Sequence, residues 1–433
     1  METLKSQQAT KVVIIGGGFA GLETARALKK APVSITLIDK TNHYCFQPLL
    51  YQVATAALNP AEIAQPLRGQ LRDQKNCQIR LGSVSDIDTQ NNKVFIGEEA
   101  IAYDYLVLAA GTVSFYFGHE KEWMPVALSL KSLADALDMR DRILRAFENA
   151  EWAKTEEERA YYLTFVVVGG GPTGIELAGA LSEIARNTLA KNFRHIEPRS
   201  ARIILVEGFN RILPPFPPDL AEKAKQRLLK MRVEIMCSQH VEQIDADGVV
   251  VSGQRIRAST VLWAAGVRPS PLTAALKVPL DKTGRVLVEP DLSIPEHKNV
   301  MAVGDVAYII DKKTGQPVPG VAQGAMQMGR RAAANICCDL AGKKRESFIY
   351  RDLGSLAQVG RGVAVAHIGR IKMVGFLAWC LWLFVHLRSI VGFNLKFIIL
   401  FKWAWSFFTH ERDSRLLADK VLISAEQRQK EPD

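Results

Sequence analysis

GGGFAGLETA at residues 16–25 and GGGPTGIELA at residues 169–178 are two copies of one sequence pattern, 153 residues apart. Aligned without gaps, they share G-G-G-x-x-G-x-E-x-A, and each follows a short apolar run typical of a buried strand. Glycines at a strand end allow a tight turn, and the next helix presents its free N–H groups to phosphates. The pattern therefore predicts two strand–turn–helix units, each in an α/β domain that binds a dinucleotide.

Each copy is followed by an acidic residue at the end of a later predicted strand. Asp39 lies 21 residues beyond Gly18, and Glu207 lies 36 residues beyond Gly171. An acid about 20 residues after such glycines commonly accepts hydrogen bonds from a ribose hydroxyl. The wider spacing in the second copy predicts a longer crossover helix. We expect both acids to bind ribose, and the alternative is that they are solvated residues at strand ends.

Three further apolar runs end on small or acidic residues. Two of them end in Ala-Ala-Gly, at Gly111 and Gly266, and a third ends in Gly304 and Asp305. Small residues allow close packing against a flat ring. Because ligands of open parallel sheets bind at the carboxyl ends of the strands, we expect these residues beside a cofactor.

Composition excludes several other classes of protein. The 433 residues, with 48% hydrophobic and 23% charged side chains, favour two or three globular domains over a disordered or fibrous chain. The six cysteines include no C-x-x-C pair, which argues against zinc ribbons, thioredoxin-type sites and iron–sulfur clusters. The eight histidines show no metal-ligand spacing either. We therefore expect no metal site, and a reduced intracellular protein without an export signal.

The excess positive charge gathers in an apolar, aromatic-rich tail. Residues 353–410 contain six Lys and Arg but no Asp or Glu, and residues 374–408 hold four of the seven tryptophans. This combination favours an anionic membrane surface over nucleic acid as a partner. The tail is therefore expected to bind lipid.

The tail is predicted to lie on the membrane without crossing it. Its longest uncharged stretch has 15 residues, whereas a span needs about 20. We expect two amphipathic helices, about 374–388 and 394–408, with Arg388, Lys396 and Lys402 meeting anionic lipid. The alternatives are a buried helical hairpin and a dimer interface.

Several further stretches together resemble the type II NADH:quinone oxidoreductases, single-subunit and non-pumping members of the glutathione-reductase-like flavoproteins. They are HYCFQPLLYQVAT at 43–55, AQPLR at 64–68, WAAGV at 263–267, AQGAMQ at 322–327 and WAWSFF at 403–408. The resemblance covers residues 11–408, nearly the whole chain. It implies two Rossmann-like dinucleotide-binding domains and a C-terminal membrane anchor.

The resemblance also implies the cofactors and the residues that hold them. In this family the first glycine loop binds FAD non-covalently, and the second binds NADH as a substrate. The residues implied for FAD are Gly16, Gly18, Gly21, Asp39 and Asp305, and those implied for NADH are Gly171, Gly174 and Glu207. The glycine and strand-end patterns add Gly111, Gly169, Gly266 and Gly304 to the predicted cofactor-binding set.

The reaction implied is a relay in which NADH gives a hydride to FAD and a membrane quinone then takes two electrons, without proton pumping. Glu176 matches a family glutamate near the flavin, although a glutamate in a first helical turn could merely complement the helix dipole. Gln323 and Gln327, four residues apart on one helix face, match the family's quinone pocket. A solvated helix face is the alternative for this pair. These three residues are the catalytic candidates.

The expected organisation is an FAD-binding domain over 1–115 and 285–345, an NADH-binding domain over 116–284, and a membrane-anchoring region over 346–433. The expected location is the cytoplasmic face of the inner membrane, with a homodimer possible. One alternative is a sulfide:quinone oxidoreductase, which requires a pairing of Cys237 with a cysteine at 337–338. Another is a flavin-binding NADH sensor with negligible quinone turnover.

Overall fold

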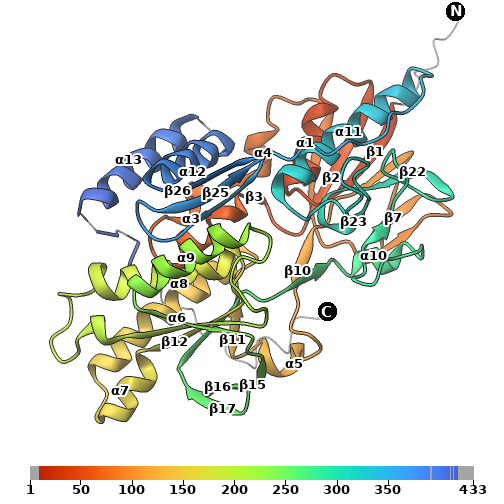
Figure 1. Cartoon of the computed structure of the whole chain (residues 1–433). Helices are drawn as coiled ribbons and strands as arrows, with labels where there is room; N and C mark the ends of the chain where they lie inside the picture. The colour runs from red at the N-terminus through yellow and green to blue at the C-terminus, as the bar shows by residue number, and fades with distance from the viewer. Residues whose placement is uncertain (1–8, 391–392, 410, 413, 418–433) are drawn as a thin grey trace, which may run out of the picture.

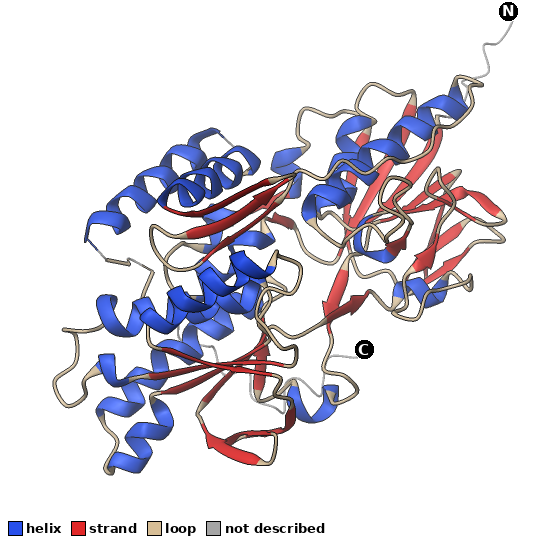
Figure 2. Cartoon of the chain, viewed as in Figure 1, coloured by secondary structure: helices blue, strands red, loops and turns tan. Residues whose placement is uncertain are grey.

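The computed structural model describes residues 9–390, 393–409, 411–412 and 414–417, coloured from red to blue in Figure 1. Two parallel β-sheets, each containing one of the two glycine-rich turns, occupy the upper right and the lower left of that view. A third part, formed by the end of the chain, lies at the upper left. Figure 2 shows helices covering these sheets, which is the α/β architecture expected from the repeated pattern.

The first sheet has the strand order β21-β22-β9-β1-β2-β5, and all its strands are parallel except β21. The strands are β1 (Thr10–Ile15), β2 (Val33–Asp39), β5 (Cys77–Leu81), β9 (Tyr105–Leu108), β21 (Ser293–Ile294) and β22 (His297–Ala302). The order places β22 beside β9, although about 190 residues separate them along the chain. The chain therefore returns to the first sheet after completing the second.

Two helices far apart in sequence pack together on this first unit. They are α1 (Phe19–Ala27) and α11 (Ala322–Leu340). Gly329 lets the two backbones approach, because a Cβ at this position would lie 2.3 Å from the carbonyl oxygen of Ala20. Thr24 uses the short distance to donate a hydrogen bond of 3.1 Å from Oγ1 to the Gly329 carbonyl.

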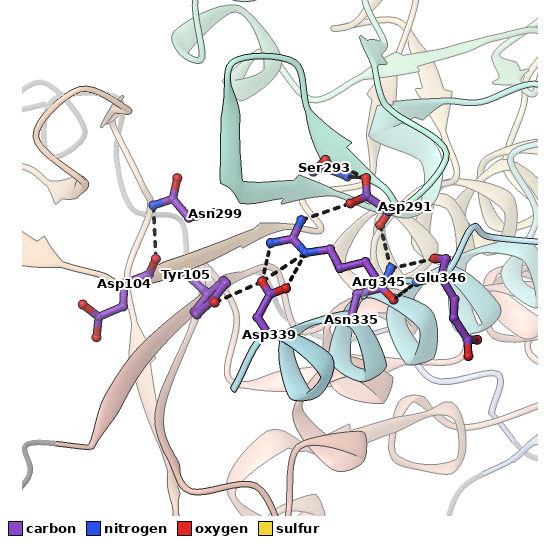
Figure 3. Close-up of polar contacts among 9 residues, drawn as sticks. All are labelled: Asp104, Tyr105, Asp291, Ser293, Asn299, Asn335, Asp339, Arg345 and Glu346. Atoms are coloured by element: carbon purple, nitrogen blue, oxygen red, sulfur yellow. Dashed lines mark hydrogen bonds and ion pairs between the residues drawn. The ribbon is translucent and has the colours of Figure 1, made fainter. Parts of the chain in front are cut away.

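A polar cluster holds the returning segment in place (Figure 3). Arg345 Nε donates to both carboxylate oxygens of Asp339 at 3.0 Å, and its Nη1 donates to Asp291 at 3.2 Å. The Tyr105 hydroxyl donates to the same Asp339 carboxylate at 3.0 Å. Asn335 Nδ2 donates to the Asp291 carbonyl at 2.9 Å. Strand β9, helix α11 and the segment before β21 are thus joined at one point.

The second sheet has the order β11-β18-β12-β13-β14, and all its strands are parallel. The strands are β11 (Ala127–Ser129), β12 (Thr164–Val168), β13 (Arg202–Glu207), β14 (Val233–Cys237) and β18 (Thr260–Trp263). The main helices of this unit are α6 (Leu133–Glu151), α8 (Pro172–Glu183) and α9 (Pro218–Lys230). The apolar runs of β12 and β13 are buried, as expected for central parallel strands.

The crossover between β12 and β13 is longer than in the first unit, but only part of the extra length is helical. Helix α8 continues into a π-helical turn, η2 (Ile184–Thr188), and an irregular segment containing η3 (Pro198–Ser200) follows. Glu151 holds this segment because its carboxylate accepts hydrogen bonds from the backbone N–H groups of Arg194, His195 and Ile196. The prediction of a longer crossover helix is therefore confirmed in part, because α8 and η2 have 12 and 5 residues against the 9 of α1, and the remaining added length is irregular.

Each unit also carries a three-stranded antiparallel sheet. The first is β6 (Asp86–Asp88), β7 (Lys93–Ile96) and β8 (Glu99–Ala102), and the second is β15 (Val241–Asp245), β16 (Gly248–Val251) and β17 (Gln254–Arg257). Strands β10 (Thr112–Ser114) and β19 (Val267–Pro269) pair between the two units. The shorter elements are β3 (His43–Cys45), η1 (Gln47–Leu49), α2 (Leu50–Ala54), α3 (Pro60–Ile63), β4 (Ala64–Pro66), α4 (Leu67–Gln70), α5 (Glu120–Trp123), α7 (Glu156–Tyr162), α10 (Leu272–Ala275), β20 (Val286–Leu287), η4 (Gly304–Val306) and β23 (Ala307–Tyr308).

The C-terminal part is a small antiparallel sheet followed by two helices. The sheet contains β24 (Ser355–Gln358), β25 (Ala364–Ile368) and β26 (Ile371–Gly375), and the helices are α12 (Phe376–Ser389) and α13 (Phe393–Thr409). The helix bounds are close to those expected from the sequence. Within the described residues, no helix is long and apolar enough to cross a membrane.

Candidate active site

The first glycine loop joins β1 to α1. Gly16 has φ of +101°, and a Cβ there would lie 2.3 Å from the Ala109 carbonyl oxygen. A Cβ on Gly21 would lie 1.8 Å from the carbonyl oxygen of Gly16, so only glycine fits at both positions. Gly18, the residue before α1, has nothing within 4 Å of its Cβ position. The N-terminus of α1 is therefore open to a phosphate group.

The second glycine loop, between β12 and α8, repeats this geometry. Gly169 has φ of +106°, and its Cβ position lies 2.6 Å from backbone atoms of Ala264. Gly174 would place a Cβ 1.7 Å from the Gly169 carbonyl oxygen, while Gly171 faces open space. In the first loop Gly16 and Gly21 are close-packed and Gly18 is free for a ligand. In the second loop Gly169 and Gly174 are close-packed and Gly171 is free.

The two acidic residues also occupy matching positions. Asp39 Oδ2 accepts a hydrogen bond from the Gly17 N–H at 2.6 Å, and Glu207 Oε2 accepts one from the Gly170 N–H at 2.5 Å. The second oxygen of Asp39 accepts from the Thr41 N–H, and that of Glu207 accepts from the Phe209 N–H. Each carboxylate is thus held beside its loop, with lone pairs still free to accept hydrogen bonds from ribose hydroxyls.

Asp305 lies at the carboxyl end of β22, as expected for a ligand-binding residue of a parallel sheet. It follows Gly304, whose φ of +73° turns the chain into η4. Thr112 Oγ1 donates to Asp305 Oδ2 at 3.4 Å, which brings the end of β9 and Gly111 to the same edge. Gly266 lies at the corresponding edge of the second sheet, where its Cβ position is 3.3 Å from the Phe115 carbonyl oxygen.

A cavity lies where α2 and α8 meet the C-terminal part of the chain; we call it the central cavity. Its lining residues are Tyr51, Gln52, Thr55, Ala57, Glu176, Ala180, Glu183, Gln358, Gly360, Arg361, Trp379, Trp382, Leu383, Trp403, Ser406, Phe407 and Arg412. The aromatic side chains come mainly from α12 and α13, and the polar ones from α2, α8 and β24. The lining therefore combines aromatic side chains with polar and charged ones.

Glu176 is one of two acidic residues of α8 that line the central cavity, and Glu183 is the other. The sequence suggested that Glu176 lies in the first turn of this helix. The helix starts at Pro172, so Glu176 is its fifth residue and lies just beyond the first turn. Its side chain is half-buried, yet protein atoms surround the carboxyl group on most sides. Burial raises the pKa of Glu176 to about 8, although a hydrogen bond of 3.3 Å from the Gln358 N–H opposes the shift.

A hydrogen-bonded chain crosses the central cavity from α13. Trp403 Nε1 donates to Gln52 Oε1 at 2.8 Å, and Gln52 Nε2 donates to the Tyr51 hydroxyl at 3.0 Å. The Tyr51 hydroxyl in turn donates to Gln358 Oε1 at 2.5 Å. Burial, and then the nearby Glu176, raise the pKa of Tyr51 far above its ordinary value, so the phenol stays protonated. These hydrogen bonds were not predicted from the sequence, although Tyr51 and Gln52 lie in the motif at 43–55.

Gln323 and Gln327 share a face of α11, as expected, but they do not line the central cavity. Gln323 Nε2 donates to the Gly354 carbonyl at 3.1 Å, and its Oε1 accepts from the Leu353 N–H at 2.8 Å. Gln327 binds the Arg351 carbonyl and N–H in the same way, both at 2.9 Å. The pair therefore holds the segment that leads into β24, and β24 carries Gln358 to Glu176.

The end of the described chain closes one side of the central cavity. Arg412 is buried, and its Nη1 donates to the Thr55 carbonyl at 2.6 Å. Its Nη2 forms an ion pair of 3.0 Å with Glu183 of α8. Arg361 Nη1 donates to the carbonyls of Ser406 and Phe407 in the last turns of α13. The tail is thus bound to the second unit by charged groups as well as by apolar packing.

The cysteines do not form a redox pair in this structure. All six are described and all are free thiols. Burial raises the pKa of Cys45 to about 12 and also raises that of Cys237 and Cys337, which disfavours the reactive thiolate. Cys237 lies on β14 and Cys337 on α11, in different units of the chain. The pairing that a sulfide:quinone oxidoreductase requires is therefore not present among these thiols.

The two matched loops define a reductase with two dinucleotide-binding units, and the family of pyridine nucleotide-disulphide oxidoreductases matches residues 10–329. The type II NADH:quinone oxidoreductase Ndh of Mycobacterium tuberculosis is 43% identical over 438 residues, which cover 98% of this chain and 93% of that protein. The enzyme of the same description from Staphylococcus aureus is 30% identical and covers 82% of this chain and 89% of its own.

Among solved structures, NDH2 from Plasmodium falciparum in complex with NADH has a TM-score of 0.86 at 18% identity, covering 95% of this chain and all of that one. This likeness supports the fold. The chain belongs to the pyridine nucleotide-disulphide oxidoreductases and, within them, to the type II NADH:quinone oxidoreductases. The family resemblance and the activity predicted from the motifs are therefore confirmed.

Proposed function

We propose that the first glycine loop holds FAD without a covalent bond, that the second holds NADH, and that a membrane quinone is reduced from the tail side. The observation that carries this assignment is the matched geometry of Gly18 and Gly171, each open beside an acid held by its own loop. When bound, FAD supplies the flavin ring that takes a hydride from NADH and passes two electrons to the quinone.

The chain's own residues bind and orient these groups. Gly16 and Gly21 keep the first loop close-packed, Asp39 holds a ribose, and Asp305 with Gly111 faces the sugar-phosphate part of FAD. Gly169, Gly174 and Glu207 do the same for NADH, and Gly266 faces its nicotinamide end. This assignment corresponds to an FAD unit over 1–115 and 285–345, an NADH unit over 116–284 and a tail over 346–433. Residues 1–8 and 418–433 lie outside the described residues.

Glu176 supplies a proton on the quinone side. Because its pKa is raised to about 8, its carboxyl group is mostly protonated at neutral pH and can donate to an oxygen that gains electron density. Gln358, which binds Glu176 through its N–H and Tyr51 through its side chain, keeps the carboxyl group oriented. Gln323 and Gln327 act by holding the segment before β24. Strand β24 in turn carries Gln358 into the lining of the central cavity, where we place the quinone.

The tail binds the membrane surface through one face of its two helices. Trp382 and Ile399 on the inner face are buried, whereas Phe401 is 69% exposed and Phe408 is 79% exposed on the outer face. Such a row of exposed aromatic side chains favours insertion among lipid headgroups. We infer attachment at the cytoplasmic face of the inner membrane, where anionic lipid meets the basic tail.

One part of the predicted lipid contact was wrong. Lys402 forms a close ion pair with Glu62 of α3, and its side chain is mostly buried. Lys396 Nζ donates to the Arg388 carbonyl at 3.1 Å and stays at the surface. Arg388 and Lys396 are therefore the residues of this set that remain available to anionic headgroups.

Matched valine substitutions in the two loops test the cofactor assignment. Gly18 and Gly171 have φ of −75° and −70°, which any residue adopts, so valine blocks only the approach of the ligand. Gly18→Val should purify with little FAD. Gly171→Val should keep its FAD, while binding of NADH weakens by about tenfold or more. Visible absorbance measures bound flavin, and rapid mixing with NADH measures its reduction.

The two variants serve as controls for each other because the change in volume is the same. If Gly18→Val does not fold without FAD, refolding in excess FAD gives its relative affinity. Equal flavin contents in the two variants, or loss of FAD from Gly171→Val alone, would contradict the assignment.

A further inference from the structure

A second cavity lies at the opposite end of α8 from the glycine loop; we call it the arginine cavity. Its lining residues are Ser182, Glu183, Arg186, Asn187, Arg227, Met231 and Arg361. They come from the ends of α8 and α9, the π-helical turn η2, and the loop between β24 and β25. The volume of about 190 Å³ exceeds that of a single water molecule, about 30 Å³ in the liquid, several-fold. It has room for a group the size of a phosphate.

The charge of this lining is strongly positive. Three arginines contribute to it, and the carboxylate among the lining residues, that of Glu183, already has cationic and backbone partners. Glu183 Oε2 pairs with Arg412 at 3.0 Å, and its Oε1 accepts a short hydrogen bond from the Arg361 N–H. Arg232 lies close enough to lower the pKa of Arg186, after the larger effect of burial. The cavity thus concentrates positive charge that Glu183 does not neutralise.

Two of the arginines have donors without acceptors. Arg186 Nη2 donates to the carbonyls of Ala201 and Arg232 at 3.3 and 3.4 Å, but its Nε and Nη1 are buried with no partner. The side chain of Arg227 makes no hydrogen bond or ion pair within the part of the chain that the structure describes, and its Nε is buried. Arginines near helix ends often bind the last carbonyls, and Arg186 partly does so. Arg227 does not.

We propose that the arginine cavity binds a phosphate anion, most favourably the phosphate of an anionic lipid headgroup. Planar guanidinium groups bind phosphate oxygens through paired hydrogen bonds, and a bound anion would satisfy donors that are otherwise costly to bury. The site is distinct from the NADH pyrophosphate site. The 12 residues of α8 separate the two by roughly 18 Å at 1.5 Å per residue.

The position of the cavity favours lipid over free phosphate. Arg361 donates to the Ser406 and Phe407 carbonyls, so the cavity lies beside the last turns of α13. Trp405 and Phe408 in the same turns are exposed. A tail that lies on the membrane places this end of α13 at headgroup depth. Only this choice of source rests on the proposed membrane attachment; phosphate binding does not.

Thermal unfolding of the full FAD-loaded chain in neutral detergent micelles tests the proposal. Phosphatidylglycerol, phosphatidylcholine and inorganic phosphate are titrated separately, and the rise in the unfolding midpoint gives an affinity for each. The test variant is Arg227→Gln. The matched control is Lys225→Gln, which removes the same charge from the opposite side of α9 and does not line the cavity.

Wild-type protein and Lys225→Gln should bind phosphatidylglycerol alike, and Arg227→Gln should bind about tenfold more weakly. An effect of phosphatidylglycerol alone identifies the lipid headgroup as the source, and an equal effect of inorganic phosphate identifies free phosphate. If Arg227→Gln does not fold, Arg227→Lys replaces it and should lose part of the affinity. Equal affinities in the test and control variants for every anion would overturn the proposal.

Discussion

Glu23 and Glu176 occupy the same position in the two copies of the repeated motif, yet their surroundings differ. Glu23 on α1 has a side chain that is only 16% exposed, and it forms ion pairs with Arg26 and Arg330. Glu176 faces the central cavity and forms no ion pair within the described residues, and burial raises its pKa. The same residue in the same helical position is thus paired with arginines in one unit, and has a pKa raised by burial in the other.

The raised pKa of Glu176 predicts a pH dependence of quinone reduction. Because the carboxyl group loses its proton as the pH rises through about 8, the rate of the quinone half-reaction should fall across that range. Glu176→Gln should slow this half-reaction on the order of a hundredfold at neutral pH and abolish the fall. Rapid-mixing kinetics between pH 6 and 10 (roughly two units either side of the pKa) measure both effects.

Protein stability provides a control that does not depend on catalysis. The pKa of Glu176 in the folded protein lies above its ordinary value of 4.5. The stability that protonated Glu176 contributes is therefore complete below pH 4.5. It is lost as the pH rises toward 8. Glu176→Gln should therefore gain thermal stability relative to wild type above pH 8. Identical pH profiles of stability in the two proteins would contradict the raised pKa.

Glu207 predicts a preference for NADH over NADPH. Its carboxylate is held by the Gly170 and Phe209 N–H groups, where it would repel a 2′-phosphate by on the order of 1–3 kcal/mol. Arg211 donates to the Phe216 and Pro214 carbonyls and forms no ion pair with Glu207 in the described structure. Glu207→Gln should narrow the ratio of kcat/KM between the two cofactors. Equal efficiency in the wild type would show that Glu207 does not set this choice.

At the scale of elements, helix α13 reaches the central cavity through Trp403. Its indole N–H donates to Gln52, which fixes the Tyr51 hydroxyl against Gln358. This contact connects α13, which has an exposed apolar face, with α2 and β24. The position of α13 therefore affects the geometry around Glu176 as well as attachment to the membrane.

Trp403→Phe tests that connection. Loss of the indole donor leaves the buried Gln52 oxygen unsatisfied, which costs about 1–3 kcal/mol, and frees Tyr51 to change its orientation. We expect slower flavin reoxidation by quinone and unchanged flavin reduction by NADH. Trp405→Phe is the control because Trp405 lies on the exposed side of the same helix. Equal rates of flavin reoxidation in the two variants would show that the Trp403 hydrogen bond does not affect quinone reduction.

Several elements could be predicted from sequence because their signals are local. Glycines in the two loops are required by backbone contacts shorter than a Cβ allows, so the loops and their acids were found by spacing alone. The bounds of α12 and α13 followed from apolar, aromatic-rich runs that contain no acidic residue. The crossover after α8 was misjudged in part, because a gap in sequence does not distinguish a longer helix from a loop held by Glu151.

The central and arginine cavities could not be predicted because they form between segments far apart in the chain. The Trp403–Gln52 contact joins residues 351 positions apart, and Arg412–Thr55 joins residues 357 apart. No local pattern reports such contacts. The glutamines at 323 and 327 were recognised as a shared helix face, but their binding to the 351–354 backbone depends on where that segment returns.

At the scale of the whole molecule, the tail has two roles on its two faces. Its inner face covers the central cavity, and its outer face carries exposed apolar side chains that we propose lie on the membrane. In this proposal a quinone dissolved in lipid reaches the cavity without crossing bulk water. Attachment and catalysis are therefore expected to be separable by substitutions on the outer face alone.

Replacing Phe401 and Phe408 with serine tests this separation. Each buried aromatic side chain contributes about 1.5–3 kcal/mol, so the double variant should bind anionic liposomes at least tenfold more weakly. NADH oxidation with a water-soluble quinone should remain unchanged. Trp152→Ser, at an exposed aromatic position on the second unit, is the control. Undiminished liposome binding by the double variant would show that another surface attaches the chain.

The central claim is that one site first takes electrons from NADH and then passes them to quinone. Rapid mixing of the full FAD-loaded chain in detergent with NADH alone, followed by mixing with a short-chain quinone, tests it most directly. We predict that NADH bleaches the flavin absorbance without quinone present, and that quinone then restores it at a rate compatible with turnover. Bleaching that requires quinone, or a reduced flavin that quinone does not reoxidise, would contradict the account.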